Sequence, residues 1–193
     1  MGAEGERFLA TVGGCLVSLP YDMKVLFEAM IEENLDRRAR EIAAGTILYL
    51  LSRNDAPPQD QPHLAYVDDA ILLRLALQTI AARGGEGALD FTRRFPEYYE
   101  TLEGDLACFR DYLADSFRWL EGKIEAMPRT VYKGKKVADY LNSEEAADFL
   151  YEESLAFATD YELDEEVISR VKRAEPIKQH LERRMAEDAK RIA

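Results

Sequence analysis

Four aspartates and one histidine lie close together in one short stretch of the chain, and these residue types can bind a metal ion. Carboxylate oxygens are the ligands that Mg²⁺, Mn²⁺ and Ca²⁺ prefer, and a bound ion can activate water for hydrolysis with one carboxylate as the base. The spacing does not follow a calcium-loop motif. The stretch therefore allows a divalent-cation site or a metal-dependent hydrolase of unidentified substrate, formed by Asp55, Asp60, His63, Asp68 and Asp69.

The same aspartates also have a simpler structural role. Asp68 and Asp69 come directly before an apolar helical run. At such a position a carboxylate can accept hydrogen bonds from free backbone N–H groups, and it faces the positive end of the helix dipole. Adjacent residues on a helix also point in different directions, which disfavours a shared ion. We therefore favour helix capping, with no cofactor, over a metal site.

Two apolar helices must hold this stretch in place. Apolar spacings of three and four predict one helix from a cap at Asp36 to Leu51 and another from about Asp68 to Arg83, where two glycines end it. The three prolines at positions 57, 58 and 62 exclude a regular helix between them. A preceding helix is predicted over residues 21–35, after Pro20.

The helix predicted from Asp36 begins with three arginines in its first turn, Arg37, Arg38 and Arg40. Positive charge there opposes the helix dipole. We therefore expect an acidic neighbour, for which Glu32 and Glu33 are the nearest candidates.

Residues 49–73 resemble the YkvA-like family of small bacterial helical proteins, a family of unknown function. Arg53 stands where the family has a proline, and Gln59 replaces an aspartate, which removes one carboxylate from any shared acidic cluster. The resemblance implies a helical region over roughly residues 20–82 and no particular activity. The matching positions are Tyr49, Ser52, Asp55, Pro58, Pro62, Leu64, Tyr66, Asp68 and Asp69, of which Tyr49, Pro58, Pro62, Leu64 and Tyr66 are expected to be structural.

The second half of the chain is predicted to contain one long central helix, from about Pro96 to Met127, bent at Gly104 or Gly122. Its apolar residues follow spacings of three and four, which fit packing along another helix. Packing within the chain is the favoured interpretation, and a homodimer through helix 97–127 is the alternative. These apolar residues are Leu102, Leu106, Phe109, Leu113, Phe117, Leu120, Ile124 and Met127.

The helical period breaks at residues 130–137, where β-branched residues flank Lys133-Gly134 and predict a small hairpin or an extended loop. Further helices are predicted to start at Ser143, at Asp164 and near Pro176. The sequence therefore predicts an all-α, multi-helix bundle. It divides into a YkvA-like region over residues 1–83 and a C-terminal helical extension over residues 86–193, packed as one unit.

Charge is unevenly distributed along a chain of 193 residues with a net charge of −12. Residues 137–169 hold 11 acids and no base, whereas residues 170–193 hold eight bases and four acids. Such a run usually marks a solvated face, and this is the favoured interpretation. The alternative is that the basic terminal helix lies against the acidic segment, in the same chain or in a partner. The overall negative charge argues against nucleic acid and anionic membranes as general partners. Since no apolar run is long enough to span a bilayer, we expect a cytoplasmic protein with no membrane span.

Three functions remain open at the level of sequence. The favoured one is a protein-interaction or scaffold module without catalysis, because glycine-rich phosphate loops, nucleophile motifs and paired histidines are absent from the sequence. The second is the metal-binding protein or hydrolase described above. The third is a nucleic-acid or membrane-surface partner that uses the basic terminal helix and the small basic patch of Lys133, Lys135 and Lys136.

Overall fold

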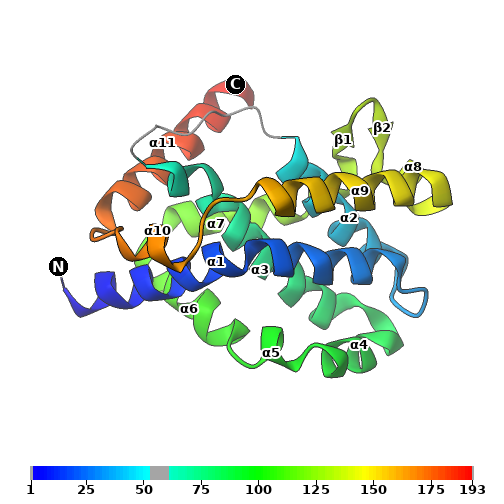
Figure 1. Ribbon diagram of the computed structural model, residues 1–193, viewed down its shortest axis with the longest axis horizontal. Coiled ribbons are helices and arrows are strands. Elements are labelled where there is room, and N and C mark those ends of the chain that lie inside the picture. The colour runs from blue at the N-terminus through cyan, green and yellow to red at the C-terminus, as the bar shows by residue number, and fades with distance from the viewer. Residues whose placement is uncertain (1, 53–60, 193) are drawn as a thin grey trace.

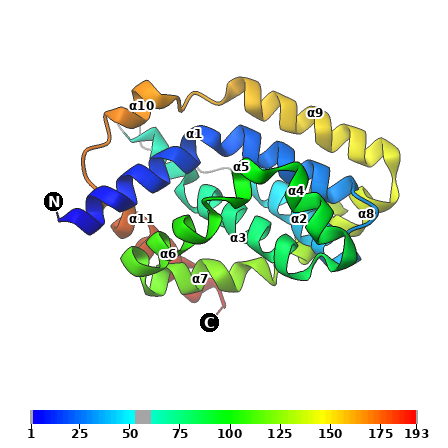
Figure 2. The ribbon, with the colours of Figure 1, turned by 90° about the horizontal axis from the view of Figure 1, so that it is seen from below.

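Three helices pack against one another at the centre of the computed structural model, which describes residues 2–52 and 61–192 (Figures 1 and 2). They are α1 (Ala3–Ile31), α2 (Arg37–Leu51) and α3 (Val67–Arg83), the last preceded by a 3-10 turn, η1 (Pro62–Tyr66). The prediction of an all-α bundle is confirmed. The bounds of α2 and the end of α3 also agree with the sequence pattern. The N-cap position of α3 is Tyr66, whose side chain makes no capping hydrogen bond, and Asp68 and Asp69 lie in the first turn of the helix instead.

The first helix is longer than its sequence pattern predicted. A start at Tyr21 is wrong, because α1 runs without interruption from Ala3 through Pro20. A proline inside a helix costs about 3 kcal/mol. Here Leu16 and Leu19 before it and Met23 after it are all fully buried, and this continuous apolar face packs against α2 and α3. Tertiary packing therefore outweighs the local cost.

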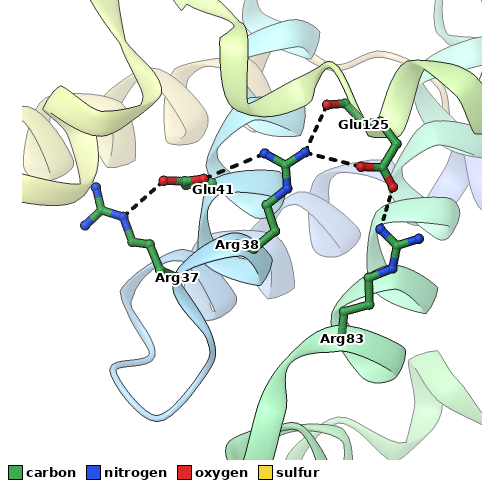
Figure 3. A network of polar contacts seen from close by, with 5 residues as sticks. All are labelled: Arg37, Arg38, Glu41, Arg83 and Glu125. Atoms are coloured by element: carbon green, nitrogen blue, oxygen red, sulfur yellow. Dashed lines mark hydrogen bonds and ion pairs between the residues drawn. The ribbon is translucent and has the colours of Figure 1, made fainter.

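The acidic residues that pair with the arginines at the start of α2 are not the ones that the sequence predicted. Figure 3 shows Arg37 and Arg38 paired with Glu41 of the same helix, and Arg38 paired as well with Glu125, which also binds Arg83. Glu32, one of the two predicted partners, pairs with Arg94 instead. The i,i+3 and i,i+4 spacings within α2 bring Glu41 within reach, and packing adds Glu125 from the end of another helix.

The long helix predicted over residues 96–127 is wrong. The chain forms α4 (Ala88–Arg94) and α5 (Pro96–Tyr99) and then two longer helices, α6 (Leu102–Leu113) and α7 (Asp115–Ile124), followed by a 3-10 turn, η3 (Met127–Arg129). The break is at Ala114, which has a φ of 50°, and not at either glycine. Since α6 and α7 both turn their apolar residues inward, the apolar spacing continues across the break and conceals it.

The packing supports the favoured interpretation, in which the apolar residues of 97–127 pack within the chain. All eight apolar residues listed for this stretch are buried within the single chain. They contribute to one hydrophobic core that also contains residues of α1, α2 and α3.

The hairpin predicted near residues 130–137 is confirmed. Strand β1 (Val131–Tyr132) pairs in antiparallel with β2 (Lys135–Lys136). The two turn residues, Lys133 and Gly134, both have positive φ, as a tight two-residue hairpin requires.

The last third of the chain forms four helices, of which the sequence predicted the last three and missed the first. These are α8 (Val137–Asn142), α9 (Glu144–Asp160), α10 (Glu165–Ser169) and α11 (Glu175–Ile192). Ser143 and Asp164 accept hydrogen bonds from backbone N–H groups in the first turns of α9 and α10, as N-caps do.

The acidic and basic segments do not lie against each other within the chain. Helix α9 lies along α1 and α8, whereas α11 packs on α7. Figure 2 shows α9 and α11 on opposite sides of the central helices. The alternative of a contact within the chain is therefore wrong. The favoured solvated face agrees with α9, whose acidic residues are mostly exposed. Across residues 2–52 and 61–192, no helix combines the length and the apolar composition needed to cross a membrane.

Candidate functional site

Two neighbouring depressions on the outer face of α1 form the strongest candidate binding site. Figures 1 and 2 both show α9 lying beside α1 and antiparallel to it. The first depression, of about 320 Å³, lies between these helices, and the second, of about 620 Å³, lies between α1 and α10. Tyr21 borders both. The first is lined by Pro20, Met23, Phe27, Tyr151, Leu155 and Ala158, and the second by Leu9, Gly13, Gly14, Val17, Ile168 and Val171. We call the two together the α1 groove.

Large apolar side chains are unusually exposed in this groove. Tyr21 is 66% exposed, Leu155 49% and Tyr151 44%, and all three line the first depression. They make up half of the large apolar side chains exposed in the described part of the chain; the others are Ile31, Leu89 and Val131. Clustered apolar exposure of this kind marks an interaction surface, whereas single exposed residues are ordinary.

Two glycines shape the second depression. A Cβ added at Gly13 would lie 2.8 Å from Cγ2 of Ile168, so this glycine allows α10 to pack closely on α1. At Gly14 an added Cβ would meet nothing within 4 Å. Gly14 therefore leaves the backbone of α1 open to close approach from outside.

A buried ion pair lies beneath the groove, and Ser18 connects it to the lining of the groove. Ser18 lines the second depression and donates a hydrogen bond of 3.2 Å to Asp22 of the same helix. Arg74 of α3 donates to the Ser18 hydroxyl at 3.0 Å and pairs with the Asp22 carboxylate at 3.3 Å. Asp22 is completely buried and Arg74 almost so. The pair joins the centres of α1 and α3.

Burial controls the electrostatics of this pair and of the thiol beside it. It raises the pKa of Asp22 to about 7, although the Arg74 charge acts in the opposite direction. Burial also raises the pKa of the Cys15 thiol to about 12, which keeps the thiol protonated and poorly nucleophilic at neutral pH. The arrangement therefore suits structural pairing better than nucleophilic catalysis.

The predicted metal-binding residues are only partly visible. Asp55 and Asp60 lie outside the described residues. His63, Asp68 and Asp69 are all buried, and burial lowers the pKa of His63. Within residues 2–52 and 61–192 no group of three or more His, Cys, Asp or Glu side chains is arranged to hold a metal ion.

Asp68 has protein partners that the sequence did not reveal. Arg184 of α11 donates a hydrogen bond of 3.0 Å to one carboxylate oxygen, and the Tyr49 hydroxyl donates to the other at 3.4 Å. Arg184 is 116 residues away along the chain, so no local motif could have identified it. Asp68 therefore helps to attach the terminal helix. A second attachment is made by Asp188 of α11, which accepts hydrogen bonds from Trp119 and Lys123 of α7.

We expect Asp68→Asn to weaken the attachment of α11. The change replaces an ion pair by a neutral contact, and hydrogen bonds to charged groups contribute about 1.5–3 kcal/mol. Thermal unfolding should therefore show a loss of about 2 kcal/mol, and the emission of Trp119, the single tryptophan, should shift because its partner Asp188 lies on α11. Arg183→Gln, at an exposed neighbouring position, is the control. An equal loss in both variants would contradict the role of the ion pair.

The described residues of the predicted structural signature lie near the end of α2 and in the turn before α3. Leu64 is buried, and Tyr49 and Tyr66 are partly buried against the core. The Tyr66 ring contacts that of Tyr161 edge-on at 5.1 Å, which links α3 to the segment after α9. Pro62 starts the 3-10 turn η1, and Pro58 lies outside the described residues.

The small basic patch lies on the hairpin. Lys133, Lys135 and Lys136 are all exposed. Lys133 pairs with Glu153 of α9 at 2.7 Å, and its ammonium group lies over the ring of Phe149. Lys133 therefore already interacts with groups of the same chain, unlike a lysine that is open to an external partner.

No family model, curated protein or solved structure matches this chain. Membership of the YkvA-like family accordingly stays a prediction that rests on residues 49–73.

Proposed function

We propose that this protein is an interaction module that binds an amphipathic helix of another protein in the α1 groove. The observation that carries the proposal is the line of exposed apolar side chains between α1 and α9, formed by Tyr21, Tyr151 and Leu155. Helix-in-groove recognition uses apolar anchors on one face of the bound helix, spaced at i, i+3, i+4 and i+7.

The shape of the groove supports this mode of binding. Its two depressions lie one after the other along the same helix and meet at Tyr21. An extended apolar face can therefore place one anchor in each depression. Exposed aromatic residues suit such a surface, because tyrosine offers a large apolar area at a low cost in side-chain entropy.

The lining of the groove also supports docking by apolar contact. Among the described lining residues the titratable side chains other than tyrosine are Lys24, Glu28 and Glu165. The rest of the lining is mostly apolar, and removing apolar area from water contributes about 25 cal/mol per Å². Ser18, which also lines the groove, is bonded to Asp22 and Arg74.

The test is a selection of peptides on the intact protein. A displayed library of random 16-residue peptides is selected for binding, and the dissociation constants of the enriched peptides are measured by fluorescence anisotropy. We expect enriched sequences with apolar residues at helical spacing. Leu155→Glu should weaken their binding at least tenfold, because a carboxylate would enter the first depression.

Leu89→Glu is the matched control, because Leu89 is exposed to a similar extent, 58% against 49% for Leu155, but lies on α4 and away from the groove. This variant should bind the peptides as the parent does. If no sequence is enriched, or if Leu155→Glu binds the enriched peptides as tightly as the parent, the proposal is wrong.

A further inference from the structure

We infer that the helix bound in the α1 groove is basic, with lysine or arginine on both sides of its apolar face. This inference rests on the proposed function and names the chemistry of the partner. It is carried by the charges that surround the groove.

The wall of the groove that α9 and α10 provide is strongly acidic. Both helices belong to the segment over residues 137–169, which holds 11 acids and no base. Within the described part of the chain, ion pairs join Glu153 to Lys133 and Glu166 to Arg170. The other nine acids of this segment form no ion pair with a described residue, and two of them, Asp139 and Asp164, accept hydrogen bonds from backbone N–H groups at the starts of helices.

Part of this charge lies in line with the apolar residues of the groove. Glu144 and Asp148 precede Tyr151 by seven and three residues, and positions at these spacings share one face of a helix. Both are exposed. The helix face that carries Tyr151 and Leu155 therefore also carries two carboxylates closer to the start of α9.

Carboxylates also lie inside the groove. Glu28 lines the first depression and Glu165 the second. Lys24, in the first depression, is the basic residue among the described lining residues. A bound helix would therefore meet negative charge in both depressions and along α9, with one positive charge among them.

This distribution favours one class of partner and disfavours another. Complementary charge at the rim of an interface accelerates association and excludes partners of like charge. A helix with acidic flanks would place like charges side by side along α9. The basic terminal helix of this chain cannot supply the positive charge within the same molecule, since it packs on α7.

The experiment uses the tightest peptide from the selection described above, synthesised in three versions. They have the same apolar residues, but their flanking positions are lysine, glutamine or glutamate. At 50 mM salt we expect the lysine version to bind about tenfold more tightly than the glutamine version and the glutamate version to bind more weakly than both. The differences should shrink at 500 mM salt, where the Debye length is less than half as long.

The protein variant that tests the same point is Glu144→Lys/Asp148→Lys. It should remove most of the preference for the lysine version while the glutamine version still binds. Glu97→Lys/Glu100→Lys is the control with the same change in net charge, because both residues are exposed at α5, away from the groove. This control should keep the preference.

Each failure has a distinct meaning. Equal binding of the three versions, or a preference equally reduced in both double variants, would overturn the basic partner while leaving the proposed groove intact. If no peptide binds the parent protein, the proposed function is overturned instead.

A synthetic peptide of residues 174–191 serves as a further probe. If it binds the groove more tightly than every selected peptide, the occupant is a second copy of this chain, and the inference of a different partner protein is wrong.

Discussion

Gly45→Ala is expected to destabilise the protein by about 3 kcal/mol, although alanine is the better helix-forming residue by about 1 kcal/mol. A Cβ added at Gly45 would overlap the backbone carbonyl of Met127 and lie 3.0 Å from the Met127 Cβ. Backbone atoms cannot move aside as the end of a flexible side chain can. Either α2 or the η3 turn must shift, and overpacking of this kind typically costs 1–3 kcal/mol or more.

Gly122→Ala is the control for this substitution. Gly122 also lies inside a helix, α7, but an added Cβ there would meet nothing within 4 Å. This variant should gain about 0.5–1 kcal/mol through reduced entropy of the unfolded chain. Urea unfolding of both variants measures the two effects. If Gly45→Ala is as stable as the parent, the close contact between α2 and η3 is wrong.

Arg74→Met is expected to cost about 3–5 kcal/mol at pH 8, because it leaves the Asp22 carboxylate buried without its positive partner. Methionine has a similar length and adds no polar atom, so the loss should come mainly from the uncompensated charge. Replacing both partners, as in Asp22→Leu/Arg74→Met, should recover much of the stability.

The loss in Arg74→Met should depend on pH in a defined direction. Burial raises the pKa of Asp22 to about 7, against 3.8 for an ordinary aspartate. Between these values the folded protein binds a proton that the unfolded chain does not, so this group favours folding increasingly as the pH falls from 7 toward 4. Without Arg74 the pKa rises further. The difference from the parent should therefore be largest above pH 7 and smaller at pH 5.

Denaturant unfolding of parent and variant at pH 5 and pH 8 measures this difference directly. Arg83→Met is the control, because Arg83 lies on the same helix but forms an exposed ion pair with Glu125. Pairs at the surface contribute about 0–1 kcal/mol. An equal loss in Arg74→Met at both pH values would show that the charge of Asp22 is not the cause.

Local sequence signals predicted the elements whose ends depend on nearby residues. The end of α3 at Gly84, the hairpin at Lys133-Gly134 and the caps at Ser143 and Asp164 were all predicted correctly. Each depends on turn or cap chemistry within a few residues.

The errors have one physical cause, which is that tertiary packing overrides a local preference. Pro20 lies inside a helix because both sides of it are buried, and Ala114 ends a helix although its residue type favours one. In both places the apolar pattern continues unchanged, so the sequence alone contained no sign of the difference.

The candidate site was harder to predict than the fold. The acidic segment was recognised, but the groove it borders depends on α1 and α9 lying side by side. Tyr21 and Leu155 are 134 positions apart in the chain, and neither belongs to a motif. The ion pairs of Arg74 and Arg184 were not predicted for the same reason, because each arginine pairs with an aspartate on another helix.

Helix α1 is covered by helices that come much later in the chain, and this has a consequence during synthesis. This helix is synthesised well before its neighbours α9 and α10, and the Tyr161 hydroxyl donates a hydrogen bond to the Leu16 carbonyl across 145 residues. Ribosomes add about 5–20 residues each second. Part of the apolar surface of α1 therefore stays uncovered for on the order of 10 s, until its last partners have been synthesised. During this time the growing chain depends on chaperones, or on early packing with α2 and α3, to avoid aggregation.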